Sequence, residues 1–580
     1  MRTLSHQFDF CVVGGGMTGL VAALAAARRG VKTALVADRP VLGGNASSEI
    51  RMHICGAHGA NMRETGILEE LLLENHSRNP GSNYSIWDSV LYGAAQEQEN
   101  LSLFLNCTVT EAQTDGKRIT SVRGWQMTNE TWHTFNATLF ADCTGDGILA
   151  AYSGAEFRIG REAKSEYGER IPPDVADAKT MGTSCLMQLR EYAGPQPFTP
   201  PAWAHKYDAP HGSGRWWDLN TNFWWIEVGG DSEDILHVTE ESRADLMKIV
   251  FGVWDYMKNR SPEKEKHANW ALDWVGFLPA KRESRRYIGD HVLTQNDVEA
   301  QGKFDDIIAY GGWTMDDHFP AGFYHPTGGT IFHPAPSPFG IPYRTLYSRN
   351  IENLFCAGRC HSATHAAMSA TRVMATCSMM GQAVGAAAAI AVRDALTPRG
   401  VYKKRIAELQ QSLMDDDQYI PWHTREIPAL SRGAKLTADA DPEPLRNGVD
   451  RPVGDADNGC RVPLGSAITY RFGAPAELSC VRIVFDSDLN RQDTIERPEN
   501  RNMRYRQPLV APPWGLPASL VKDFRIEAET DGEWRVIARV ENNKQRLVRL
   551  PVSATATALR LVCESTYGAS DAHLFAFELS

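Results

Sequence analysis

Two glycine-rich segments, far apart in the chain, have residue types and spacing that could hold a dinucleotide. The first is Gly14-Gly15-Gly16-Met17-Thr18-Gly19, and the second runs from Asn353 to Arg359. In the first, the glycine spacing lets the backbone approach a pyrophosphate, and the following helix N-terminus offers its amides to the phosphates. In a flavin enzyme of the Rossmann type, a segment much later in the chain must also return to hold the flavin half of the cofactor. Together the segments predict FAD.

The residues around the first glycine turn have the pattern of a βαβ unit. The apolar run 8–13 predicts a buried parallel strand, and the alanine-rich stretch 20–29 predicts a helix. A second strand over 31–37 would deliver Asp38 about 20 residues after Gly19, where an acid that accepts from the ribose hydroxyls is expected. A carboxylate there disfavours NADP, because it would repel the extra phosphate.

Two more segments are expected beside the cofactor. The loop 42–53, rich in small and polar residues, should run along the pyrophosphate and the isoalloxazine, and a strand ending near residue 142 should place a third turn there. The full set of predicted FAD-binding residues is Gly14, Gly16, Met17, Thr18, Gly19, Asp38, Arg39, Gly43, Gly44, Asn45, Ser47, Ser48, Val109, Thr144, Gly145, Asp146, Gly358, Arg359, Ser369 and Arg372.

Histidine is the expected base for an alcohol whose hydride goes to a flavin, because its pKa lies near operating pH. The predicted catalytic candidates are His53 and Arg51 on the loop, His361 and His365 after Gly358, His318 in the central region, and Arg285, which could clamp a carboxylate or stabilise an anionic reduced flavin. Each histidine could equally be structural. The spacing of His318 with His325 and His333 matches no standard ligand pattern, so no metal site is predicted.

Composition indicates an ordinary globular protein of two or three domains. The chain has 580 residues, 43% of them hydrophobic and 23% charged. Its net charge is −11 and no basic run tracks a phosphate backbone, so nucleic acid is not an expected partner. The 11 scattered cysteines, the start without a leader pattern and the polar residues in the alanine-rich helices favour a cytoplasmic protein with no membrane segment.

The predicted fold class is α/β with four segments. A Rossmann-type FAD-binding domain occupies 1–150 and 346–425, a mixed α+β substrate domain is inserted at 151–345, and a β-sandwich or jelly roll occupies 430–580. The aromatic residues Trp216, Trp217 and 223–225 of the insertion could cap the flavin or form a structural core. A helix of small residues is expected over 376–391.

Several separated motifs, in the right order, resemble the bacterial FAD-dependent oxidoreductase family with a glutathione-reductase-type fold. They are the first glycine turn, the loop 42–51, the block 282–289, and the stretch 341–344 leading to 353–359 and 369–374. The resemblance covers about residues 8 to 420. One departure is Gly358-Arg359, where many such flavoproteins have Gly-Asp and use the aspartate to bind ribitol, so another group must make that contact.

The C-terminal segments 431–434, 447–451 and 531–534 resemble a galactose-binding or discoidin-like jelly roll. Together the resemblances imply a flavin oxidoreductase whose relatives are often encoded beside carbohydrate-degrading enzymes. We therefore expect a hydroxylated small-molecule substrate, a sugar or glycoside, and an electron acceptor that the sequence does not identify. The sandwich could bind sugar, act as a lid or form a homo-oligomer.

Two other functions remain open from the sequence. One is redox-neutral cleavage, in which transient oxidation of a sugar hydroxyl acidifies the adjacent C–H and permits elimination. The other is a non-catalytic carbohydrate-binding protein. A disulfide-reductase function for Cys356 and Cys360 is disfavoured, because in that class the redox pair follows the early strands of the first domain.

Overall fold

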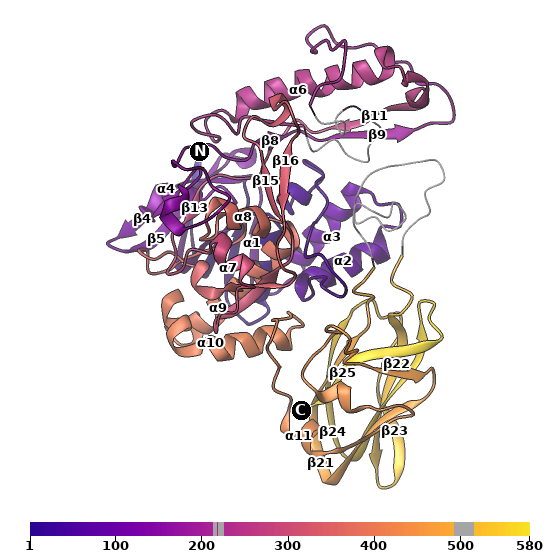
Figure 1. The fold of residues 1–580 in the computed structure, drawn as a ribbon. Helices are drawn as coiled ribbons and strands as arrows, with labels where there is room; N and C mark the ends of the chain where they lie inside the picture. The colour runs from indigo at the N-terminus through magenta and orange to yellow at the C-terminus, as the bar shows by residue number, and fades with distance from the viewer. Residues whose placement is uncertain (213–216, 218–225, 492–514) are drawn as a thin grey trace. The chain divides into compact units, whose positions relative to one another are not determined.

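The computed structural model describes residues 1–212, 217, 226–491 and 515–580. Among these, the chain forms two compact units (Figure 1). The first contains residues 1–57 and the described part of 81–409, and the second contains 58–80, 410–491 and 515–580. The segment 58–80, which interrupts the first unit in the sequence, therefore groups with the C-terminal part of the chain.

A largely parallel sheet positions the first glycine turn. Its order is β3-β2-β1-β6-β5-β4, and β18 pairs with the end of β6. The strands are β1 (Arg2–Val13), β2 (Thr33–Val36), β3 (Leu101–Phe104), β4 (Cys107–Asp115), β5 (Arg118–Gln126), β6 (Thr131–Asp142) and β18 (Leu354–Cys356). The pairs β1–β2, β1–β6, β2–β3 and β6–β18 are parallel, so the carboxyl ends of these strands meet at one edge. The predicted Rossmann-type sheet is confirmed, including the late return of the chain.

Two helices of small residues pack closely in this unit. In α9 (Met374–Arg393), a Cβ on Gly381 would overlap the carbonyl oxygen of Thr18, and a Cβ on Gly385 would overlap that of Ala22 in α1 (Met17–Ala27). Among the described helices, α9 is the one long and apolar enough to cross a membrane, and 89% of its apolar window is buried within the fold. Its apolarity is thus explained by core packing.

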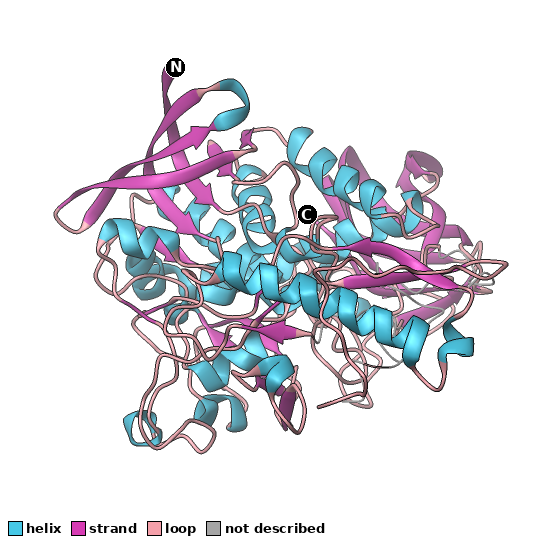
Figure 2. Ribbon diagram, turned by 90° about the horizontal axis from the view of Figure 1, so that it is seen from above, coloured by secondary structure: helices cyan, strands magenta, loops and turns pink. Residues whose placement is uncertain are grey.

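Further helices flank the strands of the first unit (Figure 2). Among them, α3 (Tyr84–Gln96) packs on β3, α4 (Ile148–Ser153) on β4, and α8 (His365–Thr371) on residues 315–318, and α10 (Pro398–Asp415) begins in this unit.

The region between the two halves of the parallel sheet is a mixture of short sheets and helices, as predicted. Its elements are β7 (Phe157–Arg158), α5 (Lys164–Tyr167), β8 (Thr183–Ser184), β9 (Met187–Glu191), β10 (Glu227–Val228), α6 (Thr239–Asp255), β11 (Trp270–Val275), β12 (Ala280–Lys281), β13 (Arg286–Tyr287), α7 (Gln295–Glu299), β14 (Ile307–Gly311), β15 (Met315–His318), β16 (Thr330–His333) and β17 (Phe339–Pro342). Trp217 is buried and packs edge-on against Tyr207 and Tyr256, which makes it a core residue. Trp216 and residues 223–225 lie outside the described residues.

The second unit contains the predicted β-sandwich, built from antiparallel strands in the order β20-β25-β21-β24-β22-β23, with β19 on β21. The strands are β19 (Lys435–Thr437), β20 (Cys460–Pro463), β21 (Ala467–Phe485), β22 (Val521–Thr530), β23 (Glu533–Val540), β24 (Leu547–Thr566) and β25 (Asp571–Leu579), preceded by α11 (Ala429–Gly433). The long strands β21 and β24 pair with each other through two register shifts. Each therefore spans two short apolar runs of the sequence, 467–472 and 480–485 in β21 and 547–551 and 559–563 in β24.

Helix α2 (Ile67–Arg78) is tied into the second unit by a buried carboxylate. Glu69 is 1% exposed, accepts a hydrogen bond from Ser487 at 2.7 Å, and pairs with Arg491 at 2.6 Å and Arg63 at 3.1 Å. Burial alone would raise the pKa of Glu69, but the two arginines lower it to about 2. This carboxylate therefore stays charged in the folded protein.

Replacing Glu69 with glutamine should lower the free energy of unfolding by about 3–5 kcal/mol, because it leaves buried arginine charge without its partner. Urea denaturation followed by circular dichroism measures this loss. The control is Glu74→Gln on the same helix, whose partner Arg78 is 61% exposed, and it should cost less than about 1 kcal/mol. Equal effects of the two substitutions would show that Glu69 does not tie α2 to this unit.

Candidate active site

The turn between β1 and α1 leaves room for a ligand that any side chain would fill. Gly14 has a φ of +110°, and a Cβ on it would lie 2.5 Å from the backbone of Cys143. Gly16 is the N-cap of α1, and a Cβ on Gly44 would lie 3.0 Å from its Cα. With no side chain at the N-cap, the first amides of α1 face the turn and are available to an anion.

A cleft of about 320 Å³ begins at this turn and crosses the carboxyl edge of the parallel sheet. Fifteen of the predicted cofactor residues line it: Gly14, Gly16, Met17, Thr18, Asp38, Arg39, Gly43, Gly44, Asn45, Val109, Thr144, Gly145, Asp146, Arg359 and Arg372. They come from four segments far apart in the sequence. This glycine cradle, with its helix N-terminus and acid after the second strand, fits an extended dinucleotide such as FAD.

The other five predicted cofactor residues lie behind the wall of the cleft. Gly19 and Gly358 permit close approach, since a Cβ on Gly19 would overlap the carbonyl oxygen of Gly14 and one on Gly358 would lie 2.6 Å from the Thr18 hydroxyl. Ser47 donates to the Gly44 carbonyl at 2.7 Å, and the Ser48 amide donates to Asp88 at 3.0 Å. Ser369 donates to the Ala366 carbonyl at 2.6 Å within α8. These residues shape the cleft without lining it.

The unusual Gly358-Arg359 pair has a carboxylate partner from another segment. Arg359 donates to Oδ1 of Asp146 at 2.8 Å, and Lys281 lies 2.9 Å from Oδ2 of the same carboxylate. Burial would raise the pKa of Asp146, but these two cations lower it to about 2. Asp146 lines the cleft, so an acidic group stands beside Arg359 even though the Gly-Asp sequence is absent.

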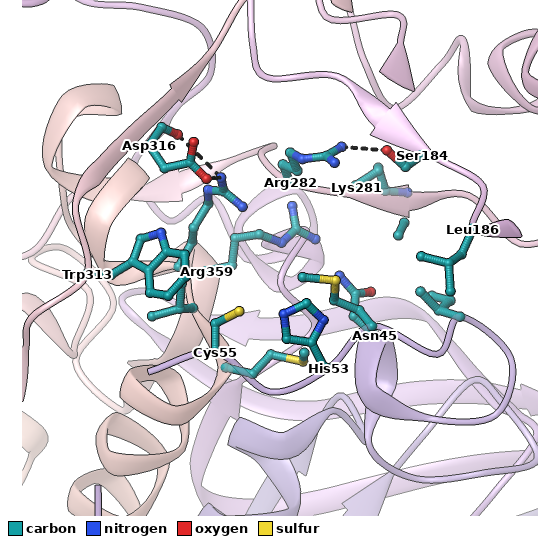
Figure 3. A pocket seen from close by; sticks show the side chains of 16 residues that line it. Asn45, His53, Cys55, Ser184, Leu186, Lys281, Arg282, Trp313, Asp316 and Arg359 are labelled. Atoms are coloured by element: carbon teal, nitrogen blue, oxygen red, sulfur yellow. Dashed lines mark hydrogen bonds and ion pairs between the residues drawn. The ribbon is translucent and has the colours of Figure 1, made fainter. Parts of the chain in front are cut away.

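A smaller cavity of about 90 Å³ adjoins the cleft (Figure 3). It is lined by Asn45, Ile50, Met52, His53, Cys55, Ser184, Leu186, Ala280, Lys281, Arg282, Trp313, Asp316, Arg359, Arg372, Val373 and Met374. Five of these residues also line the dinucleotide cleft: Asn45, Lys281, Arg359, Arg372 and Met374. A group held in the smaller cavity would therefore border the cleft.

Among the six predicted catalytic candidates, only His53 is a lining residue of this cavity; it is 2% exposed. Arg51 is held away from it: its side chain donates to Gln188 at 3.0 Å, and its guanidinium lies 4.4 Å from the Trp274 ring centre. Arg285 donates to the backbone carbonyl of Asp146 at 3.3 Å and lies over Phe157. Neither arginine lines either cavity, and Arg285 contacts the cleft residue Asp146.

His361 is fully buried and lines neither cavity. Its Nε2 lies 2.8 Å from the Thr371 hydroxyl, and burial lowers its pKa to about 3, with a smaller contribution from the positive charge of Arg286. His361 is therefore a neutral packing residue in this structure.

His318 lies one layer behind the smaller cavity. Its Nδ1 is 2.8 Å from Glu227 and its Nε2 is 3.1 Å from Asp316. Burial would lower the pKa of His318, but the two carboxylates raise it and so favour the protonated ring. Asp316 also accepts from Arg372 at 3.1 Å, and Glu227 pairs with Arg282 at 2.6 Å. The result is a chain of alternating charges, from Arg372 to Arg282, whose two ends line the cavity.

His365 is enclosed by a second buried cluster. Its Nδ1 lies 2.9 Å from Glu283 and its Nε2 lies 3.0 Å from Asp317. Arg286 pairs with Glu283 and, at 2.8 Å, with Glu162. Burial would lower the pKa of His365, but the carboxylates raise it to about 10. A histidine held in this way is a poor proton acceptor at neutral pH.

The His365 cluster should make stability depend on pH. An unfolded histidine loses its proton near pH 6.5 whereas folded His365 keeps it to about pH 10, so this contribution is complete below pH 6.5 and is lost as pH rises toward 10. For one proton the free energy of unfolding should fall by about 1.4 kcal/mol per pH unit. Urea denaturation at several pH values should give a smaller slope for His365→Gln. A ring NMR signal that titrates near pH 6.5 in the folded wild type would contradict this account.

The sequence pattern did not single out Lys281, Arg282 or Asp316 as cavity residues. No periodic pattern singles them out, and they reach the cavity through β12 and β15 of the insertion. The sequence signal that pointed toward this part of the cavity was the block 282–289 of the family resemblance, which begins at Arg282.

The fold and the two cavities define a flavin-dependent oxidoreductase of the dinucleotide-binding class. The family model described as "FAD dependent oxidoreductase" matches residues 9–413, and the chain belongs to this family. It is an FAD-dependent enzyme.

Glycerol-3-phosphate dehydrogenase 2 of Mycobacterium bovis is 40% identical over 73 residues, which is 13% of this chain and 12% of that protein. Glycerol-3-phosphate dehydrogenase of Mycobacterium leprae is 40% identical over 70 residues, which is 12% of each chain. The chain thus matches about one-eighth of the length of these curated relatives.

Solved structures with some similarity include two family 32 carbohydrate-binding modules. The module from Streptococcus pneumoniae EndoD has 14% identity and a TM-score of 0.19, covering 26% of this chain and 97% of the module. The module of C. perfringens NanJ, in complex with galactose, has 8% identity and a TM-score of 0.18, covering 26% of this chain and 94% of that one.

Proposed function

We propose that the chain oxidises a hydroxylated small molecule that enters the smaller cavity. Bound FAD would supply the acceptor for a hydride from the carbon that carries the hydroxyl. The hydroxyl proton would pass to His53 and the C–OH group would become a carbonyl, which balances the two electrons and two protons lost by the substrate.

The observation that carries this proposal is the shared wall of the two cavities. Asn45, Arg359 and Arg372 line both, so a molecule in the smaller cavity can be close to a cofactor in the cleft. His53 lines the smaller cavity but not the cleft, which puts this base on the substrate side. The buried position of His53 would also keep water away from the proton transfer.

We further propose a polyol or a sugar as the source of the hydroxyl. Asn45, Ser184 and Asp316 offer polar groups at the cavity wall that suit more than one hydroxyl. The mycobacterial relatives are named for glycerol 3-phosphate, which is also a hydroxylated compound.

Anaerobic mixing of the yellow holoenzyme with a panel of polyols, sugars and hydroxy acids tests the proposal. A substrate should bleach the flavin absorbance once per enzyme and yield a carbonyl product in equal amount. Product that keeps forming without an acceptor would instead support redox-neutral cleavage. The absence of bleaching and of product across the panel would contradict both enzymatic functions.

A further inference from the structure

The charges at the wall of the smaller cavity are strongly unbalanced. Four cationic side chains, Lys281, Arg282, Arg359 and Arg372, line it, and Asp316 is the single carboxylate among its lining residues in the described part of the chain. In Figure 3, Lys281 and Arg282 lie on one side of the cavity, and His53 and Cys55 lie on the other.

Asp316 in the wall and the carboxylates behind it do not remove this excess. Asp146 is shared between Lys281 and Arg359, Glu227 pairs with Arg282, and Asp316 pairs with Arg372. Glu227 and Asp316 also contact the two ring nitrogens of His318, one each, and favour its protonated form. Among the residues that the structure describes, Lys281, Arg282, Arg359, Arg372 and His318 therefore share three carboxylates around one small space. Such an arrangement is costly unless another anion completes it.

Arg282 shows which cavity that anion would occupy. Lys281, Arg359 and Arg372 also line the dinucleotide cleft, where they could face the cofactor, whereas Arg282 lines only the smaller cavity. Its guanidinium is fixed by Glu227 at 2.6 Å and by the Ser184 hydroxyl at 2.8 Å. Burial, with the positive charge of Arg372, lowers the pKa of Arg282 despite Glu227, as expected for a guanidinium among other cations.

We propose that the substrate of this site carries an anionic group, a carboxylate or a phosphate ester, and that Arg282 recognises it. The inference rests on the proposed function, because it assigns the substrate class of the same cavity. A planar guanidinium suits either anion. The cavity of about 90 Å³ has room for roughly six to nine water-sized groups, at about 10–15 Å³ each, so the part of the substrate it admits is small.

Matched pairs of compounds test the inference in the holoenzyme. Glycerate and glycerol 3-phosphate are compared with glycerol, and glucuronate and glucose 6-phosphate with glucose. We expect the half-saturating concentration for flavin bleaching to be about 10- to 100-fold lower for the preferred anion than for its neutral partner. This ratio corresponds to the free energy of one charge-assisted hydrogen bond. The anion with the lower half-saturating concentration in each set shows whether the site prefers a carboxylate or a phosphate. If the neutral compounds bleach the flavin at equal or lower half-saturating concentrations, the inference is overturned, but the proposed oxidation still stands.

Variants of Arg282 give the second arm. Arg282→Gln should raise the half-saturating concentration of the anion about 10- to 100-fold and that of the neutral partner by less than about 3-fold. Arg282→Lys should restore part of the lost affinity for the anion. Arg170→Gln is the control, because Arg170 is 61% exposed and lines neither cavity. If Arg282→Gln does not fold, the double variant with Glu227→Gln removes both charges of the pair and should show the same loss of preference. A parallel loss for both compounds would contradict a charge-specific role.

Equilibrium binding separates this inference from the oxidation itself. Calorimetric titration of the holoenzyme with glycerate, glycerol 3-phosphate and glycerol needs no turnover. If nothing in the panel bleaches the flavin, saturable binding of an anion that Arg282→Gln weakens would still support the anionic site. Absence of anion binding to the wild type would overturn it.

Discussion

Gly19→Ala is expected to purify without bound FAD and to bind added FAD at least about 100-fold more weakly than the wild type. The added Cβ would overlap the carbonyl oxygen of Gly14 and lie 3.1 Å from the Cβ of Cys143. Relief requires α1 to move away from β1, which displaces the amides that would meet the pyrophosphate. Fluorescence titration of the apoprotein with FAD measures the loss.

Gly93→Ala is the matched control for Gly19→Ala. Gly93 lies inside α3, and nothing stands within 4 Å of a Cβ built on it. Alanine in a helix interior is favoured over glycine by about 0.5–1 kcal/mol, so this variant should keep its flavin and its stability. A yellow Gly19→Ala protein with wild-type affinity would mean that the turn does not hold the cofactor.

His53→Ala is expected to slow anaerobic flavin bleaching by about 10²- to 10⁴-fold, the usual contribution of a general base, while FAD remains bound. His53 lines the smaller cavity but not the dinucleotide cleft, which is why cofactor binding should survive. Rapid mixing with saturating substrate measures the rate, and the flavin content of the purified variant reports the retained cofactor.

His237→Ala is the control for His53→Ala, because the His237 side chain is 83% exposed and lines neither cavity. It should bleach at the wild-type rate. If His53→Ala also does so, another group removes the proton and His53 is only part of the wall.

The glycine turn could be predicted because its chemistry is local. Strand, turn and helix follow one another, so the spacing of Gly14, Gly16 and Gly19 by itself determines how the backbone meets a phosphate. The positions of Thr144 and Asp146 were also foreseen, since they directly follow a recognisable strand. Most of the dinucleotide cleft was thus accessible from the sequence.

The catalytic candidates were harder to judge, because residue type says nothing about burial or partners. His361 and His365 follow Gly358 closely, yet one is a neutral packing residue and the other is held between carboxylates from distant segments. Arg282 meets its partner Glu227 through the short strands β12, β8 and β10, whose pairing no sequence period reveals. Such contacts depend on tertiary structure.

The sandwich shows a related limit. The short alternating runs 467–472 and 480–485 predict two strands with a break at the turn residues between them, but they form the single strand β21. Register shifts after Arg471 and Leu478 explain the break. The apolar stripe over 67–74 predicts helix α2, whereas its grouping with the C-terminal unit depends on the buried contacts of Glu69.

The central claim is that a single FAD lies along the cleft with its tricyclic ring beside the smaller cavity. A crystal structure of the holoenzyme tests it most directly. We expect the adenosine end near Asp38, the pyrophosphate at the N-terminus of α1, and the ring next to the wall shared by Asn45, Arg359 and Arg372. Density for the ring at any other place, with His53 remote from its edge, would contradict the account.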